Sequence, residues 1–186
     1  SSVDAEYAPH IRWPNAEYTE TNIDLKLKVP GGSVDIARSW QQGRWYLNAA
    51  WAPLDFELDP LGSSVKVIGR AGVLYERTGG SDVYIAKAAQ LEPVYIKSSA
   101  SGWQWYDRLG NTIDYDAKGR IVSYSRPTGL KVKFAYDSAS QARVLDTEGA
   151  TLYTVAMSDG VATSVTDRAG RSVSYQWSGT KDAKRL

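Results

Sequence analysis

The chain has 186 residues and 42% hydrophobic content, which is enough to bury a core in one or two small domains. Its net charge is +1, from 22 basic and 21 acidic residues, so composition gives no reason to expect nucleic acid or an anionic membrane as partner. The absence of cysteine excludes disulfides and thiolate metal sites, and no apolar run approaches the ~20 residues of a membrane helix. Aromatic residues are 7 Trp and 12 Tyr against 2 Phe, a bias typical of half-exposed β-surfaces.

Residues 1–21 are expected to form an irregular N-terminal arm or a partial strand, because prolines interrupt a stretch without clear periodicity. Alternation then begins: in "IDLKLKV" (23–29) the apolar residues fall on one face and the charged residues on the other. We therefore expect a strand whose buried face carries Ile23, Leu25, Leu27 and Val29. "PGG" at 30–32 turns the chain, and the pattern continues so that Trp40, Trp45 and Trp51 fall in step on the strands that follow.

The middle of the chain repeats this pattern of short strands and Gly turns. Strands are expected at 54–58, 64–69, 73–77, 82–87 and 94–97, with "DPLG" at 59–62 as one of the turns. "AKAAQL" at 86–91 is the only helix candidate, and it is too short to carry weight. We expect residues 22–102 to form a β-rich module, and the chain as a whole to be all-β and antiparallel.

The C-terminal half contains an internal repeat. "DRLGNTIDY" (107–115) returns as "DRAGRSVSY" (167–175), and between them glycines recur at intervals of 19, 20 and 21 residues: Gly110, Gly129, Gly149 and Gly170. A unit of about twenty residues has room for two strands and two tight turns, so one repeat predicts one β-hairpin. A lone hairpin cannot bury its apolar face, so the units of 103–177 are expected to join edge to edge in one strongly twisted sheet, followed by a polar tail at 178–186.

Two groups of residues are predicted to build these hairpins. Asp107 and Asp167 precede turns, where a carboxylate can accept hydrogen bonds from backbone N–H groups, and the repeated glycines supply the positive φ that tight turns need. Aromatic residues at the strand ends are expected to pack across neighbouring hairpins: Tyr115, Phe134, Tyr136 and Tyr175.

"YDAKGRI" at 115–121, the preceding "DRLGN" and the period of about twenty residues resemble the YD-repeat, or Rhs-type, proteins. The likeness is specific over residues 103–177. "IDLKLKVPGGSVDIARSW" followed by "GRWYLNAAW" also looks like the module that precedes the first YD repeats in that family.

The resemblance implies a strip of β-sheet that spirals into a hollow shell, in exported bacterial proteins where the shell encloses or presents a toxin or an adhesive domain. It implies as partner the remainder of such a shell, or another chain that pairs with exposed strand edges. Rhs-type shells end in paired Asp-Pro-x-Gly-Leu motifs that take part in self-cleavage. The similar string here, "DPLGS" at 59–63, has Ser63 in place of Leu and no second copy, so Asp59, Pro60 and Gly62 are interpreted as a turn.

Residues for catalysis are scarce, and we predict a non-enzymatic chain without cofactor or metal. His10 is the only histidine, and no serine lies in a Gly-x-Ser-x-Gly turn. A glycosidase needs only two carboxylates, but Asp55, Glu57 and Asp59, like Asp114 and Asp116, alternate with apolar residues and fit the wet side of a strand better.

The alternative function is a carbohydrate- or protein-binding adhesin module. Trp103 and Trp105 are two residues apart and share a strand face, and Trp40, Trp45 and Trp51 form a second candidate platform for stacking against a ligand. Core or cross-strand packing of the same rings is the competing interpretation.

Overall fold

The computed structural model describes residues 11–12, 17–18, 20–41, 44–58, 65–68, 73–77, 79–86 and 94–176. These residues contain no α-helix and one 3-10 turn, η2 Ala49–Trp51. The strands are β1 Ile11–Arg12, β2 Glu17–Tyr18, β3 Glu20–Val29, β4 Gly32–Gln41, β5 Arg44–Leu47, β6 Asp55–Leu58, β7 Val65–Ile68, β8 Leu74–Arg77, β9 Val83–Ala86, β10 Tyr95–Ser98, β11 Gly102–Tyr106, β12 Thr112–Asp116, β13 Ile121–Ser125, β14 Lys131–Ser138, β15 Gln141–Leu145, β16 Thr151–Ser158, β17 Val161–Asp167 and β18 Ser172–Ser174. The predicted all-β fold of consecutive antiparallel hairpins is therefore confirmed. None of the described segments is a helix long and apolar enough to cross a bilayer.

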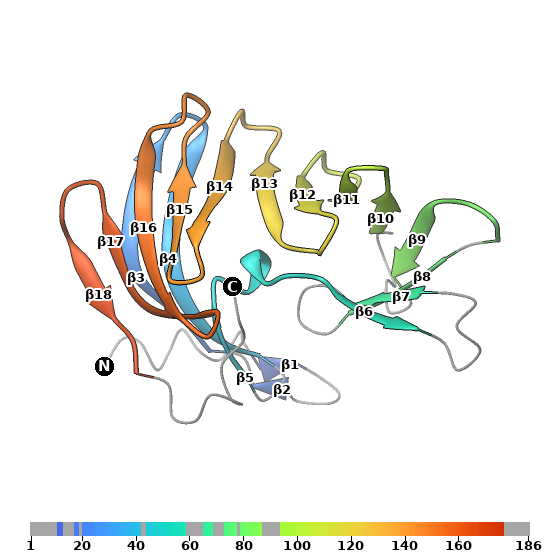
Figure 1. The fold of residues 1–186 in the computed structure, drawn as a ribbon, viewed down its shortest axis with the longest axis horizontal. Coiled ribbons are helices and arrows are strands. Elements are labelled where there is room, and N and C mark those ends of the chain that lie inside the picture. The colour runs from blue at the N-terminus through green and yellow to red at the C-terminus, as the bar shows by residue number, and fades with distance from the viewer. Residues whose placement is uncertain are drawn as a thin grey trace.

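Thirteen of the strands form one antiparallel sheet in which each strand, from β6 to β18, pairs with the next along the chain. This sheet bends into an arch, with β18 at one end and β6 at the other (Figure 1). The ladder shifts register at four places between β12 and β17. Such irregularities increase local twist, so they contribute to the curvature of the sheet.

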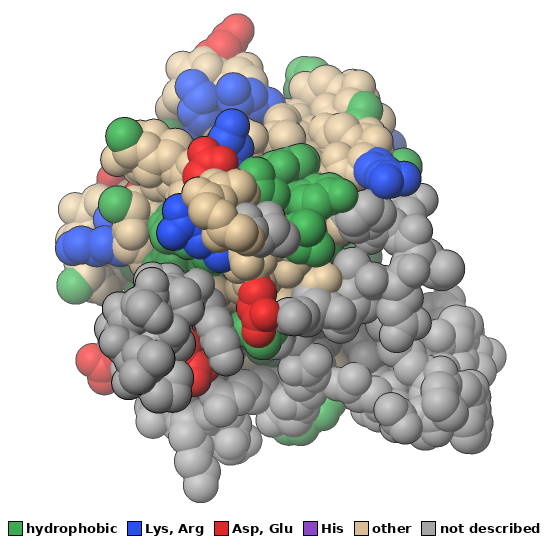
Figure 2. All heavy atoms as spheres, turned by 90° about the vertical axis from the view of Figure 1, so that its right-hand side faces the viewer, with side chains coloured by type: hydrophobic (Ala, Val, Ile, Leu, Met, Phe, Trp, Pro, Cys, Tyr) green, Lys and Arg blue, Asp and Glu red, His purple; other side chains and the backbone are tan. Residues whose placement is uncertain are grey.

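β14 illustrates how the strands of the arch divide apolar from polar side chains. In β14, Val132 and Phe134 are buried while Lys131 and Lys133 are exposed, as period-two alternation requires. Seen from the β9 end, hydrophobic side chains gather in a patch on the described surface, with charged side chains scattered around it (Figure 2).

A second sheet, of order β3-β4-β5, packs inside the arch against its C-terminal strands (Figure 1). Val34 and Ile36 of β4 share one buried apolar cluster with Val144 and Val155 of the large sheet. Two tyrosines add polar anchors: the Tyr153 hydroxyl donates to the carbonyl of Val34, and the Tyr175 hydroxyl donates to Asp24 at 2.9 Å. Residues more than a hundred positions apart in sequence thus hold the two sheets together.

The strand predicted at 23–29 has the expected position, but one of its buried positions is wrong. The ladder between β3 and β4 shifts between Ile23 and Leu25, and Ile23 is 58% exposed while Leu25 and Leu27 are buried. A bulge adds one residue and so moves the side chains before it to the other face. The bulged Asp24 accepts two hydrogen bonds from Arg38, at 2.8 and 3.0 Å.

Trp51 was also expected in step with Trp45 on a strand, and this is wrong. β5 ends at Leu47, and Asn48 adopts a left-handed conformation with φ 47° before the chain turns through η2. After η2, the backbone N–H of Leu54 donates to the carbonyl of Gly119 at 2.8 Å. The connection between the sheets is thereby fixed against the β12–β13 turn.

The structure places β1 and β2 within residues 1–21, and β3 begins at Glu20. The large sheet continues across the predicted division at 102–103, since β10 pairs with β11, which begins at Gly102. His10, the "DPLG" segment with Asp59, residues 87–91 of the helix candidate and the tail 178–186 lie outside the described residues, and Ala86 of that candidate ends strand β9.

Candidate functional site

The repeated turns share one geometry. Gly110, Gly129, Gly149 and Gly170, together with Gly119, each occupy the fourth position of a five-residue turn with φ between 86° and 93°. In the turn at Asp146, the N–H of Gly149 donates to the carbonyl of Asp146, and the N–H of Asp146 donates to the carbonyl of Ala150. This pattern describes a type I turn followed by a glycine in the left-handed conformation, a common hairpin connection.

The aspartate at the first position of these turns uses one carboxylate oxygen twice. Asp107 Oδ1 accepts from the N–H groups of the third and fifth turn residues, at 3.0 Å each. Asp116, Asp146 and Asp167 do the same at 2.9 Å. Each carboxylate therefore closes its own turn and leaves little capacity for other chemistry.

Arginine at the fifth turn position adds an ion pair that sequence reasoning missed. Arg120 Nε lies 2.9 Å from Asp116 Oδ2, and Arg171 Nε lies 2.7 Å from Asp167 Oδ2. Burial raises the pKa of both aspartates, but hydrogen bonds from these arginines and their backbone outweigh it and hold the pKa below the ordinary value. The strings "DAKGR" and "DRAGR" contain the signal, an Asp and an Arg four positions apart around a Gly.

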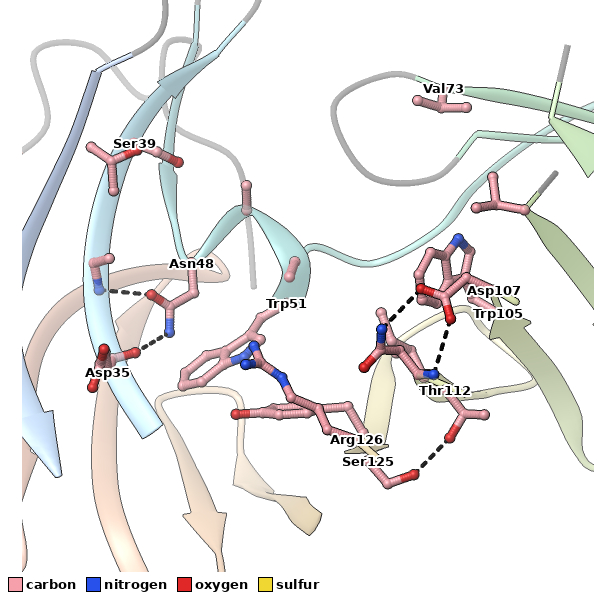
Figure 3. A pocket seen from close by; sticks show the side chains of 18 of the residues that line it. Asp35, Ser39, Asn48, Trp51, Val73, Trp105, Asp107, Thr112, Ser125 and Arg126 are labelled. Carbon is pink, nitrogen blue, oxygen red and sulfur yellow. Dashed lines mark hydrogen bonds between the residues drawn. The ribbon is translucent and has the colours of Figure 1, made fainter. Parts of the chain in front are cut away.

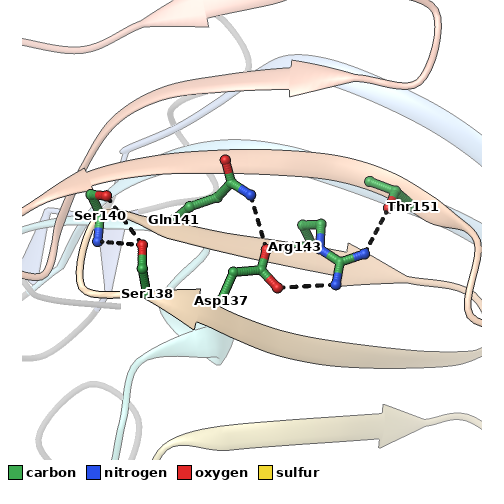
Figure 4. A network of polar contacts seen from close by, with 6 residues as sticks. All are labelled: Asp137, Ser138, Ser140, Gln141, Arg143 and Thr151. Carbon is green, nitrogen blue, oxygen red and sulfur yellow. Dashed lines mark hydrogen bonds and ion pairs between the residues drawn. The ribbon is translucent and has the colours of Figure 1, made fainter.

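Two turns on the same side of the sheet as the Gly119 turn are shorter. At β16–β17 the two central residues Asp159 and Gly160 both have positive φ, the type I′ geometry that Asp-Gly favours. At β14–β15 the two turn residues are Ala139 and Ser140. Asp137 does not close this turn; its carboxylate accepts a bidentate pair of hydrogen bonds from Arg143 on the outer face, at 2.7 and 3.0 Å (Figure 4). Gln141 and Thr151 complete that network.

The four aromatic residues predicted for repeat packing occupy the sheet in different ways. Tyr115, Phe134 and Tyr175 are buried. The rings of Phe134 and Tyr124 lie 6.1 Å apart, on neighbouring strands. The Tyr136 hydroxyl donates to the carbonyl of Ile121 at 2.6 Å, and Arg120 lies 4.4 Å above its ring.

The tryptophans do not form one platform. Trp103 packs between Phe56 and Tyr84, at 5.1 and 5.5 Å between ring centres. Trp40 and Trp45 pair edge-to-face with each other at 5.3 Å.

Trp51 of η2 and Trp105 of β11 are buried, with exposed fractions of 4% and 8%. Trp51 packs edge-to-face on Phe134 at 5.0 Å, and Trp105 Nε1 donates to the Tyr75 hydroxyl at 3.1 Å. Both of these tryptophans line one cavity.

That cavity, of about 980 Å³, lies inside the arch between the β3-β4-β5 sheet and strands β8 to β13. Figure 3 shows its two sides: Asp35, Ser39 and Asn48 lie on one, and Trp105, Asp107 and Thr112 on the other, with Trp51 and Arg126 between them. Its size reaches the upper end of the range for small-molecule sites.

Asn48 fixes the β4 side of the cavity. Its side-chain oxygen accepts from the N–H of Ala37 at 2.7 Å, and its side-chain nitrogen donates to the carbonyl of Asp35 at 2.8 Å (Figure 3). Across the cavity, Asn111 donates from its side chain to Asp107 Oδ2 at 2.9 Å. Burial raises the pKa of Asp107, but the side-chain and backbone hydrogen bonds of its turn hold that pKa below the usual value.

Two further polar groups mark the cavity. Burial raises the pKa of Tyr124 to about 12, against the opposing effect of the Arg126 charge and of Trp51. Asp35 Oδ1 is buried and has no hydrogen-bond partner among the described residues. Sequence reasoning did not single out Asp35 because its "SVDIARS" context is that of an ordinary amphipathic strand.

Two of the carboxylates considered for glycoside chemistry, Asp114 and Asp116, serve local contacts. Asp114 accepts from Gln104 at 2.7 Å and from Ser123 at 2.8 Å, and Asp116 closes its turn. Among the described residues, no group of three or more His, Cys, Asp or Glu side chains is placed to hold a metal ion. No protein-family model matches the chain, and no curated protein matches it in sequence.

Proposed function

We propose that the chain is a non-enzymatic structural module of an exported, bacterial YD-repeat or Rhs-type protein. In this role it forms one sector of a β-sheet wall that encloses or presents a toxin or an adhesive domain. The observation that carries the proposal is the single sheet of thirteen consecutive strands, bent into an arch and built with a repeated five-residue turn.

The construction suits a wall because each unit is closed by local contacts. The turn carboxylates bond backbone groups two and four residues away, so a hairpin can be added without new long-range pairing. The same contacts occupy the carboxylates that an enzyme would need, which supports a non-catalytic role.

The ends of the sheet support a partner that continues it. β18 pairs with β17 alone among the described strands, and β6 with β7 alone. The Tyr175 N–H donates to Thr163, so by alternation the N–H groups of Ser172 and Ser174 point away from β17. An edge of this kind is a template for another strand.

Cryo-electron microscopy of the gene product that carries this chain tests the proposal. We expect a further hairpin to pair with β18 and the sheet to continue into a hollow wall. Ser174→Pro, which removes an outward N–H, should weaken that continuation, whereas the matched Val173→Pro should instead loosen the β17–β18 pair. A β18 edge left facing solvent, or covered by a helix, in the complete protein would refute the assignment.

The adhesin alternative is favoured by one observation, the cavity lined by Trp51 and Trp105. The other three predicted tryptophans give it less support, because Trp40, Trp45 and Trp103 are engaged with neighbouring rings.

A further inference from the structure

The two walls of the cavity differ in chemistry. The two faces of β4 have different surroundings. Val34 and Ile36 are buried against the large sheet, while the residues that alternate with them face the cavity. The cavity-facing positions of β4 are small and mostly polar: Ser33, Asp35, Ala37 and Ser39. The facing wall carries an apolar and aromatic group, with Asp107, Asn111 and Thr112 as polar residues beside it; the group consists of Val73, Tyr75, Val94, Trp105 and Ile113.

The polar wall is long and rigid. At about 3.3 Å per residue, positions 33 to 39 of one strand extend over about 20 Å, which is longer than a single sugar ring or a single basic side chain. The Asn48 side chain holds the backbone at Asp35 and Ala37, so this wall is preorganised. A ligand that uses it needs polar groups at several positions along its length.

Asp35 determines the polarity of those groups. Its Oδ1 is buried without a donor among the described residues, whereas Asp107 already accepts three hydrogen bonds from Leu109 and Asn111. An unpaired buried acceptor gains from a donor, and an anionic ligand would be repelled there. The exposed Arg126 lines the same cavity, and its positive charge partly offsets the negative charges of Asp35 and Asp107. The charge of the site therefore does not favour a strongly cationic ligand.

The aromatic wall provides the complementary surface. The bond from Trp105 to Tyr75 occupies the indole N–H and fixes the ring, so what the ring offers the cavity is apolar. We propose that the cavity binds an uncharged oligosaccharide, with hydroxyl groups donating to Asp35 and neighbouring β4 side chains and ring C–H faces packed towards Trp105. The proposal rests on the adhesin alternative, whose cavity it uses, and is independent of the proposed wall function, since either assignment can fail without the other.

Isothermal titration calorimetry and tryptophan fluorescence of the 186-residue chain with cellotetraose, chitotetraose and maltotetraose test the proposal. At least one is expected to bind saturably. Asp35→Ala should weaken that binding about tenfold or more, because the central acceptor is lost. Asp35→Asn keeps a carbonyl acceptor in the same place and should weaken it only a few-fold.

Asp114→Ala, on the outer face of β12, is the matched control and should leave the affinity unchanged. Circular dichroism confirms that each variant is folded, and the isosteric Asp35→Asn variant keeps the test valid if Asp35→Ala does not fold. The proposal is overturned if none of the three tetrasaccharides binds, or if Asp35→Ala and Asp114→Ala behave alike. Binding of N-acetyl-lysine methylamide that both Asp35 variants abolish would identify a basic peptide side chain as the ligand instead, and would equally overturn it.

Discussion

The tip of the β3–β4 hairpin offers a direct test of how the two sheets are joined. Pro30 and Gly31 form the turn, and Gly31 has φ +85°, as the third residue of a type II turn requires. A Cβ on Gly31 would overlap the backbone nitrogen of Leu130 and lie 2.8 Å from the carbonyl carbon of Gly129. Gly31→Ala therefore forces the hairpin tip away from the β13–β14 turn.

Gly149→Ala is the matched control, because Gly149 has φ +86° and nothing lies within 4 Å of its added Cβ. A left-handed alanine costs about 1–2 kcal/mol at both positions. Gly31→Ala adds the cost of overpacking against rigid backbone, about 1–3 kcal/mol more. Urea unfolding followed by tryptophan fluorescence gives both free energies, and hydrogen exchange at residues 126–130 should accelerate only in Gly31→Ala. Equal losses of stability in the two variants would refute the close docking of the sheets.

Two other predictions concern the turns and the buried tyrosines. Asp146→Ala removes the acceptor for the N–H groups of Glu148 and Ala150 and should reduce the free energy of unfolding by about 1–2 kcal/mol, whereas Asp146→Asn keeps a side-chain oxygen and should cost less than half of that. Urea unfolding measures both, and equal losses in the two variants would contradict the role assigned to that oxygen. The free energy of unfolding should also fall as the pH rises from about 10 to 12. Burial raises the pKa of Tyr124 from 10.0 to about 12, and a raised folded-state pKa stabilises the fold only while the phenol stays protonated. Tyr124→Phe should make this alkaline loss shallower in equilibrium unfolding at stepped pH, and an unchanged slope would assign the loss to other groups.

The repeat was readable from sequence because it depends on local rules. A turn closed by Asp at its first position and Gly at its fourth needs only residues within five positions, so "DTEG" and "DRAG" predict their own geometry. The bulge at Asp24 was not readable, because its partner Tyr175 lies 151 residues away and its pairing with Arg38 depends on the packed sheets. The departure of Trp51 from the strand follows from the left-handed Asn48, whose side chain bonds to β4.

The cavity could not be predicted from the sequence either, because it depends on how distant strands face one another. Period-two alternation predicts that Asp35 lies on the other face of β4 from Val34 and Ile36. The same pattern predicts that this polar face is exposed to solvent. The arch changes this, since strands β8 to β13 bend round to face β4 across the cavity. One strand thus buries its apolar residues against the C-terminal half of the sheet and presents its polar residues to the earlier strands of the same sheet.

This double use of β4 connects the two proposals without making either depend on the other. A sheet that only had to be filled from within would be best served by apolar residues on both faces of β4, because an unpaired buried carboxylate oxygen costs stability. Asp35 instead lies on the cavity face, beside an asparagine that is fully engaged in holding the strand backbone. An Asp35→Leu variant that is more stable than the natural chain, but no longer binds a tetrasaccharide, would separate the structural role of β4 from its binding role.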